Sequence, residues 1–157
     1  MLEAGITNTE TTMVTEQNTA LALGSGTVEV FATPAMINLI EYTCARSVEN
    51  ELEAGQTTVG TNLNISHDAP TPIGMEVSCK SELVKVDGRA LSFEVEVVDE
   101  QGIVGRGTHD RFIVDKERFQ SKANAKLNKY DPLRMGIRGC SGRKVCSRVR
   151  SGVRGYR

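Results

Sequence analysis

The sequence contains no tryptophan and few other aromatic residues, with three Tyr and four Phe among 157 residues. A chain of this length is expected to fold as one domain around its own core. That core must therefore be built mainly from aliphatic side chains. The shortage of aromatic rings also removes the stacking surfaces on which single-stranded nucleic acids are bound.

Charge is not scarce, but it is unevenly placed. The segment 132–157 holds eight Lys or Arg and no Asp or Glu, which leaves 11 basic against 20 acidic residues elsewhere. The rest of the chain thus carries a net charge of -9. This balance argues against nucleic acid or an anionic membrane surface as a partner.

Long apolar runs and targeting signals are also missing. No run approaches the roughly 18 apolar residues of a membrane-spanning helix. The first residues, Met1 to Gly5, lack the basic and apolar regions of a signal peptide. We therefore expect a cytoplasmic protein.

The four cysteines are irregularly spaced and have no neighbouring Cys or His pair, so we expect free thiols and no metal site. The residues are Cys44, Cys79, Cys140 and Cys146. No phosphate-binding loop is present, and the glycines between 102 and 107 are followed by no helical pattern, which excludes a dinucleotide fingerprint. The sequence thus predicts no cofactor.

One long helix is the clearest element. Thr33 is suited to the N-cap and Pro34 to the first helical position. Apolar residues then recur at helical spacing until Gly55, which is a typical helix stop. The stripe comprises Met36, Ile37, Ile40, Cys44 and Val48.

The remaining pattern has the period of strands. One strand is expected within 9–23, and others over 56–67, 75–83, 91–97 and 103–114, with Asp87-Gly88 as a hairpin turn. In the strand 56–67, alternation places a set of side chains on one face: Thr57, Val59, Thr61, Leu63, Ile65 and His67. One helix with an antiparallel sheet indicates an α+β fold.

A short helix is expected over 116–127, and the domain is expected to span residues 1–127. From 128 to 157 the pattern dissolves into Gly, Ser and Arg, a composition typical of disorder. This basic tail can be read as an interaction segment or as an extension foreign to the domain.

Candidate catalytic residues are few, because the chain has only two histidines, His67 and His109. His67 ends a strand, where a general base can face a loop, or is a core residue. Glu41 lies beside the helical stripe, either in solvent or with a partner such as Arg111. Arg111 could instead be a surface charge or contact an anionic group of a ligand. Thr33 is explained by capping alone, although a helix N-terminus can also stabilise an oxyanion.

Three stretches together resemble the hotdog thioesterases related to fluoroacetyl-CoA thioesterase. They are Val30-Phe31-Ala32-Thr33 with Glu41, Gly60-Thr61 through His67-Asp68, and Gly107-Thr108-His109-Asp110-Arg111. The resemblance spans roughly residues 28–125. It implies a hotdog fold, with a long central helix packed on an antiparallel sheet, in a homodimer whose sites lie at the subunit interface.

The resemblance further implies an acyl-CoA thioesterase without cofactor, in which Thr33, Glu41 and His67 are catalytic. Gly60 and Arg111 would bind substrate. The Phe-rich lid that precedes the catalytic Thr in the fluoroacetyl-specific enzyme is absent, because Gly24 to Val28 contains no aromatic residue. We therefore expect a short-to-medium acyl substrate, and keep a non-catalytic acyl-CoA binder and an enoyl-CoA hydratase-like protein as alternatives.

Overall fold

The computed structural model describes residues 2–127. The chain divides into two compact units, Met1–Ala123 and Asn124–Arg157. The basic tail predicted for 128–157 lies outside the described residues. Within the part described, no helix is long and apolar enough to cross a membrane.

The order of elements is one strand, two helices, four strands and a last helix. Their bounds are β1 Thr7–Met13, α1 Ala20–Leu23, α2 Thr33–Val48, β2 Gln56–His67, β3 Glu76–Asp87, β4 Ala90–Asp99, β5 Gly102–Asp115 and α3 Lys116–Asn124, with a 3-10 turn at Glu49–Glu51 after α2. The predicted α+β class is confirmed, and the long helix ends at Val48, seven residues before Gly55.

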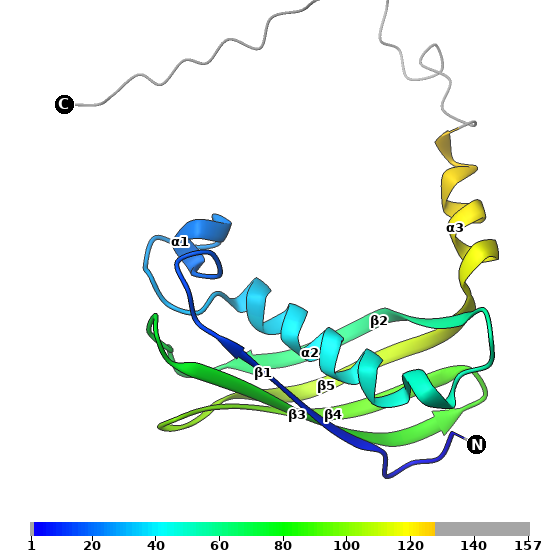
Figure 1. Cartoon of the computed structure of the whole chain (residues 1–157), viewed down its shortest axis with the longest axis horizontal. Coiled ribbons are helices and arrows are strands. Elements are labelled where there is room, and N and C mark those ends of the chain that lie inside the picture. The colour runs from blue at the N-terminus through cyan, green and yellow to red at the C-terminus, as the bar shows by residue number, and fades with distance from the viewer. Residues whose placement is uncertain (1, 128–157) are drawn as a thin grey trace, which may run out of the picture. The chain divides into compact units, whose positions relative to one another are not determined.

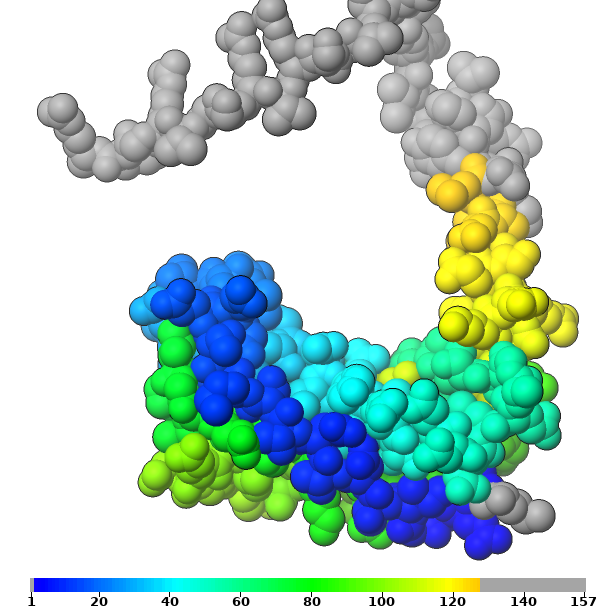
Figure 2. All heavy atoms as spheres, in the orientation of Figure 1, coloured from blue at the N-terminus to red at the C-terminus, as the bar shows by residue number. Residues whose placement is uncertain are grey.

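The five strands form one antiparallel sheet in the order β1-β3-β4-β5-β2, and α2 lies across one face of it (Figure 1). Strands β3, β4 and β5 form a meander, so β2 and β1 are left at the two edges. In the space-filling view β1 and α2 lie side by side (Figure 2). The other flank of α2 faces the β2 edge.

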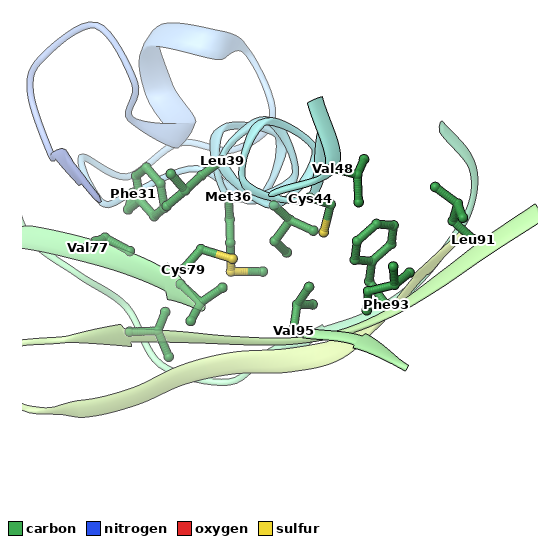
Figure 3. Close-up of a cluster of buried hydrophobic side chains, with 14 of the residues drawn as sticks. Phe31, Met36, Leu39, Cys44, Val48, Val77, Cys79, Leu91, Phe93 and Val95 are labelled. Carbon is green, nitrogen blue, oxygen red and sulfur yellow. The ribbon is translucent and has the colours of Figure 1, made fainter. Parts of the chain in front are cut away.

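The core fills the layer between α2 and the sheet (Figure 3). Met36, Cys44 and Val48 point down from the helix and are fully buried. Cys79 and Phe93 point up from β3 and β4. Each large apolar side chain buried in this way contributes about 1.5–3 kcal/mol to stability. The helix is therefore held at a fixed height over the sheet, which positions the side chains that it carries.

The strand expected within 9–23 begins two residues earlier, at Thr7, and ends at Met13. It ends at Met13 because the Asn18 side chain accepts a hydrogen bond from the Thr15 N–H at 2.8 Å and closes a turn. Thr19 then caps the short helix α1, whose C-cap is Gly24 with a left-handed φ of 69°. Residues 15–32 thus form a flap that leads into α2, and we refer to this segment as the flap.

A β-bulge in β2 makes the predicted strand face wrong in its first half. Gly60 pairs with Arg111 of β5, whereas Asn62 pairs with Asp110, so Thr61 is the extra residue. The bulge shifts the alternation by one residue. Thr58 and Gly60 therefore share the helix-facing side with Leu63, Ile65 and His67, and Thr57 and Val59 point away from the helix. Alternation alone contains no signal for such a shift.

Candidate active site

Thr33 is the first residue of α2 rather than its N-cap. The N-cap is Ala32, which has no side chain able to cap, so the predicted boundary was wrong by one residue. The Thr33 hydroxyl instead contacts His67, with 2.7 Å between Thr33 Oγ1 and His67 Nδ1. Thr33 therefore has a polar partner that helix capping does not explain. We refer to Thr33 and His67 as the dyad.

His67 reaches this position because it is the last residue of β2 and lies on the helix-facing side. The imidazole is half-buried between strand and helix. Its second nitrogen, Nε2, is buried and has no hydrogen-bond partner among the described residues. Buried polar atoms are nearly always paired in folded proteins. One ring nitrogen of His67 thus has a hydrogen-bond partner, and the other has none among the described residues of a single chain.

Glu41 lies two turns further along α2 and pairs with Arg111, at 3.5 Å from Oε2 to Nη1. This agrees with one of the alternatives that the sequence left open. The two side chains are unlike in exposure, since Arg111 is 7% exposed and Glu41 is 42% exposed. A Cβ on Gly60 would lie 2.8 Å from Glu41 Oε2, so only glycine leaves room for this carboxylate. The predicted site residue Gly60 thus adjoins Glu41.

Arg111 is held from several sides by the strands beneath it. Its Nε donates to the Thr58 hydroxyl at 2.8 Å, and its Nη2 donates to the Thr58 carbonyl at 2.9 Å. Its Nη1 lies 3.1 Å from His109 Nε2. We refer to Glu41, Arg111, His109 and Thr58 as the network. Thr58 and His109 were not among the predicted site residues. Thr58 has no sequence signal beyond its place on the strand that contains Gly60, whereas His109 is one of two histidines and lies in the stretch around Arg111 that carries the family resemblance.

The dyad and Glu41 are apart within one chain. Thr33 and Glu41 are separated by eight residues of continuous helix, which corresponds to a rise of about 12 Å. The structure therefore brings Thr33 to His67, and Glu41 to Gly60 and Arg111. It does not bring all five predicted residues to one point in a single chain.

The cysteines in the described part of the chain do not supply a nucleophile. Cys44 and Cys79 are free and fully buried. Burial raises the pKa of the Cys44 thiol to about 12 and that of Cys79 to about 11, so both are neutral at physiological pH. No group of His, Cys, Asp or Glu within residues 2–127 is arranged to hold a metal ion. Hydroxyl, imidazole and carboxylate are the reactive groups that remain.

The dyad places a hydroxyl against a possible base at the N-terminal end of α2. The first turn of a helix offers backbone N–H groups without intrahelical partners and the positive end of the helix dipole. Such groups stabilise negative charge that develops on a carbonyl oxygen. A polarised acyl group fits this arrangement at the dyad.

Residues 14–117 match the family described as fluoroacetyl-CoA-specific thioesterase. Fluoroacetyl-CoA thioesterase of Streptantibioticus cattleyicolor is 40% identical over 98 residues, which cover 62% of this chain and 70% of that protein. A variant of the fluoroacetyl-CoA thioesterase, solved with acetyl-CoA, has a TM-score of 0.76 and 33% identity, covering 80% and 98% of the two chains. A hotdog-like protein from Thermanaerovibrio acidaminovorans shares the fold, at a TM-score of 0.72 and 18% identity over 78% and 91%.

Proposed function

The chain belongs to the fluoroacetyl-CoA-specific thioesterase family, and on that premise we propose that it is a hotdog acyl-CoA thioesterase whose dyad and Glu41 perform the hydrolysis. Thioester and water yield a free acid and CoA. The observation that carries the roles of the residues is the 2.7 Å contact between Thr33 and His67 at the start of α2.

In the proposed reaction the acyl carbonyl lies over the first turn of α2, which stabilises the oxyanion. His67 accepts a proton as the attack occurs and returns it to the leaving thiolate. Three routes of attack fit. The Thr33 hydroxyl forms an acyl-threonine that water then cleaves, the Glu41 carboxylate forms an acyl anhydride that water then cleaves, or Glu41 orients a water that attacks directly. Rapid quenching followed by mass analysis of peptides separates them, because the first adds an acyl mass to Thr33, the second adds it to Glu41 and the third adds none.

We also propose that the enzyme is a homodimer paired through β2. This edge strand is twelve residues long and contains no proline and no charged residue. Edge strands of monomers are usually protected by such residues, so β2 is suited to pair with a second copy. The free Nε2 of His67, at the end of the same strand, supports a site that one chain leaves incomplete.

The bulge makes this pairing productive. Two β2 strands paired antiparallel about a two-fold axis near Leu63 would bring Gly60 of one strand close to the partner's His67 on the helix-facing side. Cross-strand partners in an antiparallel pair lie about 5 Å apart and point to the same face. Because Glu41 packs against Gly60, its carboxylate would then adjoin the dyad of the other subunit. Each dimer would have two sites, each with Glu41 from one chain and Thr33 and His67 from its partner. Light scattering should give twice the mass of the chain.

The substrate is proposed to be an aliphatic acyl-CoA of short to medium length. Between residues 14 and 30 the chain has no aromatic side chain, and Phe31 is 1% exposed and packs in the core. The exposed apolar residues of the flap are Leu21, Leu23 and Val28. An aliphatic flap offers no aromatic ring to sense fluorine, so preference for fluoroacetyl over acetyl is not part of the proposal.

A cytoplasmic location is included in the proposal. It is supported by the free thiols of Cys44 and Cys79.

Thiol release from a panel of acyl-CoAs, from acetyl to palmitoyl with phenylacetyl and fluoroacetyl included, tests the proposal. We expect turnover that falls off at palmitoyl and phenylacetyl and that is lost with His67→Ala. Loss of the crotonyl-CoA enone without thiol release would instead reveal a hydratase. Tight binding of CoA esters by the folded protein without any turnover would reveal a binder.

A further inference from the structure

His109 is fully buried and has no part in the mechanism described above. It lies on the helix-facing side of β5, opposite Leu63 of β2 and Phe93 of β4. Its Cε1 atom and Glu41 Oε2 both lie close to Gly60, at 3.1 and 2.8 Å from the position of an added Cβ. His109 thus lies next to the proposed catalytic carboxylate of Glu41.

The hydrogen bonds of His109 define its tautomer. Nδ1 lies 2.8 Å from the Asn62 carbonyl oxygen. A carbonyl can only accept, so Nδ1 carries the hydrogen. Nε2 lies 3.1 Å from Arg111 Nη1, and a guanidinium can only donate. A neutral imidazole with its hydrogen on Nδ1 satisfies both partners at once, and no other protonation state does.

The charged groups around His109 also favour its neutral form. Burial lowers the pKa of His109 from its usual 6.5, and Arg111 on the same strand lowers it further. The Asn62 carbonyl, Glu41 on α2 and Asp110 on β5 act in the opposite direction without reversing the shift. The lone pair on Nε2 is therefore available to Arg111 at physiological pH.

We propose that His109 is a positioning residue of the thioesterase reaction: its Nε2 lone pair holds the Arg111 guanidinium, and Arg111 in turn sets the Glu41 carboxylate. This inference rests on the proposed function of Glu41. Thr58 fixes Nε and Nη2 of the guanidinium, which leaves Nη1 to bridge His109 and Glu41. If His109 offers no acceptor at Nε2, the Arg111 Nη1 group can rotate, and the Glu41 carboxylate is then no longer held in one position.

Two substitutions separate this role from simple packing. His109→Gln retains an acceptor at the level of Nε2, whereas His109→Asn retains only a donor at the level of Nδ1. We expect His109→Gln to keep kcat within about threefold and His109→Asn to lower it about tenfold or more, with KM changed less than kcat. Thermal unfolding of both variants verifies that they fold. Equal kcat values for the two folded variants would overturn the inference.

The same pair of variants should behave differently once the guanidinium is removed. In an Arg111→Gln background we expect His109→Asn and His109→Gln to have the same kcat, because the acceptor then has nothing to hold. If the effect of His109→Asn simply adds to that of Arg111→Gln, the residue acts independently of Arg111 and the inference is wrong.

Nitrogen-15 NMR of the imidazoles tests the hydrogen-bond arrangement without any activity. The chain has only two histidines, so His67→Ala assigns the remaining signal to His109. We expect a neutral ring protonated at Nδ1 at physiological pH, with a pKa below the usual 6.5. A hydrogen on Nε2 would overturn the inference. If this tautomer is found but the wild type hydrolyses no acyl-CoA, the proposed function fails instead.

Discussion

At the N-terminal end of α2 one hydrogen bond of 2.7 Å joins Thr33 to His67, whereas two turns along the same helix Arg111 contacts Thr58, His109 and Glu41. The dyad leaves a ring nitrogen without a partner among the described residues. The network instead encloses a guanidinium that is 7% exposed. The dyad can therefore exchange protons, whereas the network holds its side chains in fixed positions.

This difference indicates a division of labour. A group that exchanges protons with a substrate needs few permanent partners, since each one would have to be broken during the reaction. A group that orients a catalytic carboxylate needs many, because a small displacement costs much of the rate. The dyad therefore suits the chemical step and the network suits positioning. The predictions below test this contrast.

The largest effect is expected at the dyad. Thr33→Val keeps the shape of the side chain but removes the hydroxyl, and we expect it to lower kcat about 10²- to 10⁴-fold. Thr33→Ser should retain most of the activity. Ser66→Ala, next to His67 but on the opposite strand face, is the control and should leave kcat unchanged. Thiol-release kinetics measure all three, and an active Thr33→Val would remove Thr33 from the mechanism.

A smaller loss is expected where the network is crowded. The methyl group of Gly60→Ala would lie 2.8 Å from Glu41 Oε2 and 3.1 Å from His109 Cε1, so the carboxylate must move. We expect kcat to fall about tenfold to a hundredfold with little loss of stability. Gly107→Ala is a contrasting variant, since its methyl group would meet the β2 backbone at Asn64 and Ile65. It should lower the melting temperature instead. Undiminished turnover in Gly60→Ala would contradict the assignment of Glu41.

The network should also impose a pH dependence on stability. Because burial lowers the pKa of folded His109 below its usual 6.5, the unfolded chain takes up a proton there at a higher pH than the folded chain does. The free energy of unfolding should therefore decrease as pH falls through about 6.5. His109→Gln should decrease less over the same range. Denaturant unfolding from pH 8 to pH 5 compares them, and parallel curves would show that His109 is not responsible.

A modest effect is expected at the hydrogen bond from Arg111 Nε to the Thr58 hydroxyl. Thr58→Val removes that acceptor, while the Thr58 carbonyl still holds Nη2. We expect a loss of about 1 kcal/mol in the free energy of unfolding and a change in kcat of less than about threefold. A loss of kcat as large as that of Thr33→Val would erase the distinction between the two clusters.

The smallest effect is expected outside both clusters. Arg46 and Glu49 form an exposed ion pair at 2.8 Å near the end of α2. Arg46→Ala should change stability by less than about 0.5 kcal/mol and leave kcat unaltered. The same thiol-release and unfolding measurements provide this baseline.

Much of the fold follows from the sequence because it rests on repeating patterns. The helical stripe from Met36 to Val48 and the alternation in the later strands correctly predicted α2 and the meander. Met36, Cys44 and Phe93, which those patterns placed inside, are buried. Burial of apolar surface is what periodicity measures, so these predictions were reliable.

The site was harder to predict from the sequence because it depends on individual departures from the regular patterns. The bulge at Thr61 decides that Gly60 faces Glu41, and alternation cannot reveal it. A shift of one residue at the start of α2 decides that Thr33 meets His67 rather than capping the helix. His109 was noted as the second histidine and within the stretch that resembles the family, but the role proposed for it depends on Asn62 and Arg111, which fold against it.

The most direct test of the account mixes inactive subunits. Glu41→Gln and His67→Ala chains, co-expressed with different tags and purified through both, should form dimers in which one site has every native residue. We predict about half of the wild-type activity per dimer. The matched pair of Thr33→Val and His67→Ala should stay inactive, because Thr33 and His67 of each site come from one chain. Inactivity of the first pair, with the mixed dimer formed, or recovery in the second would contradict a site shared between Glu41 of one subunit and the dyad of the other.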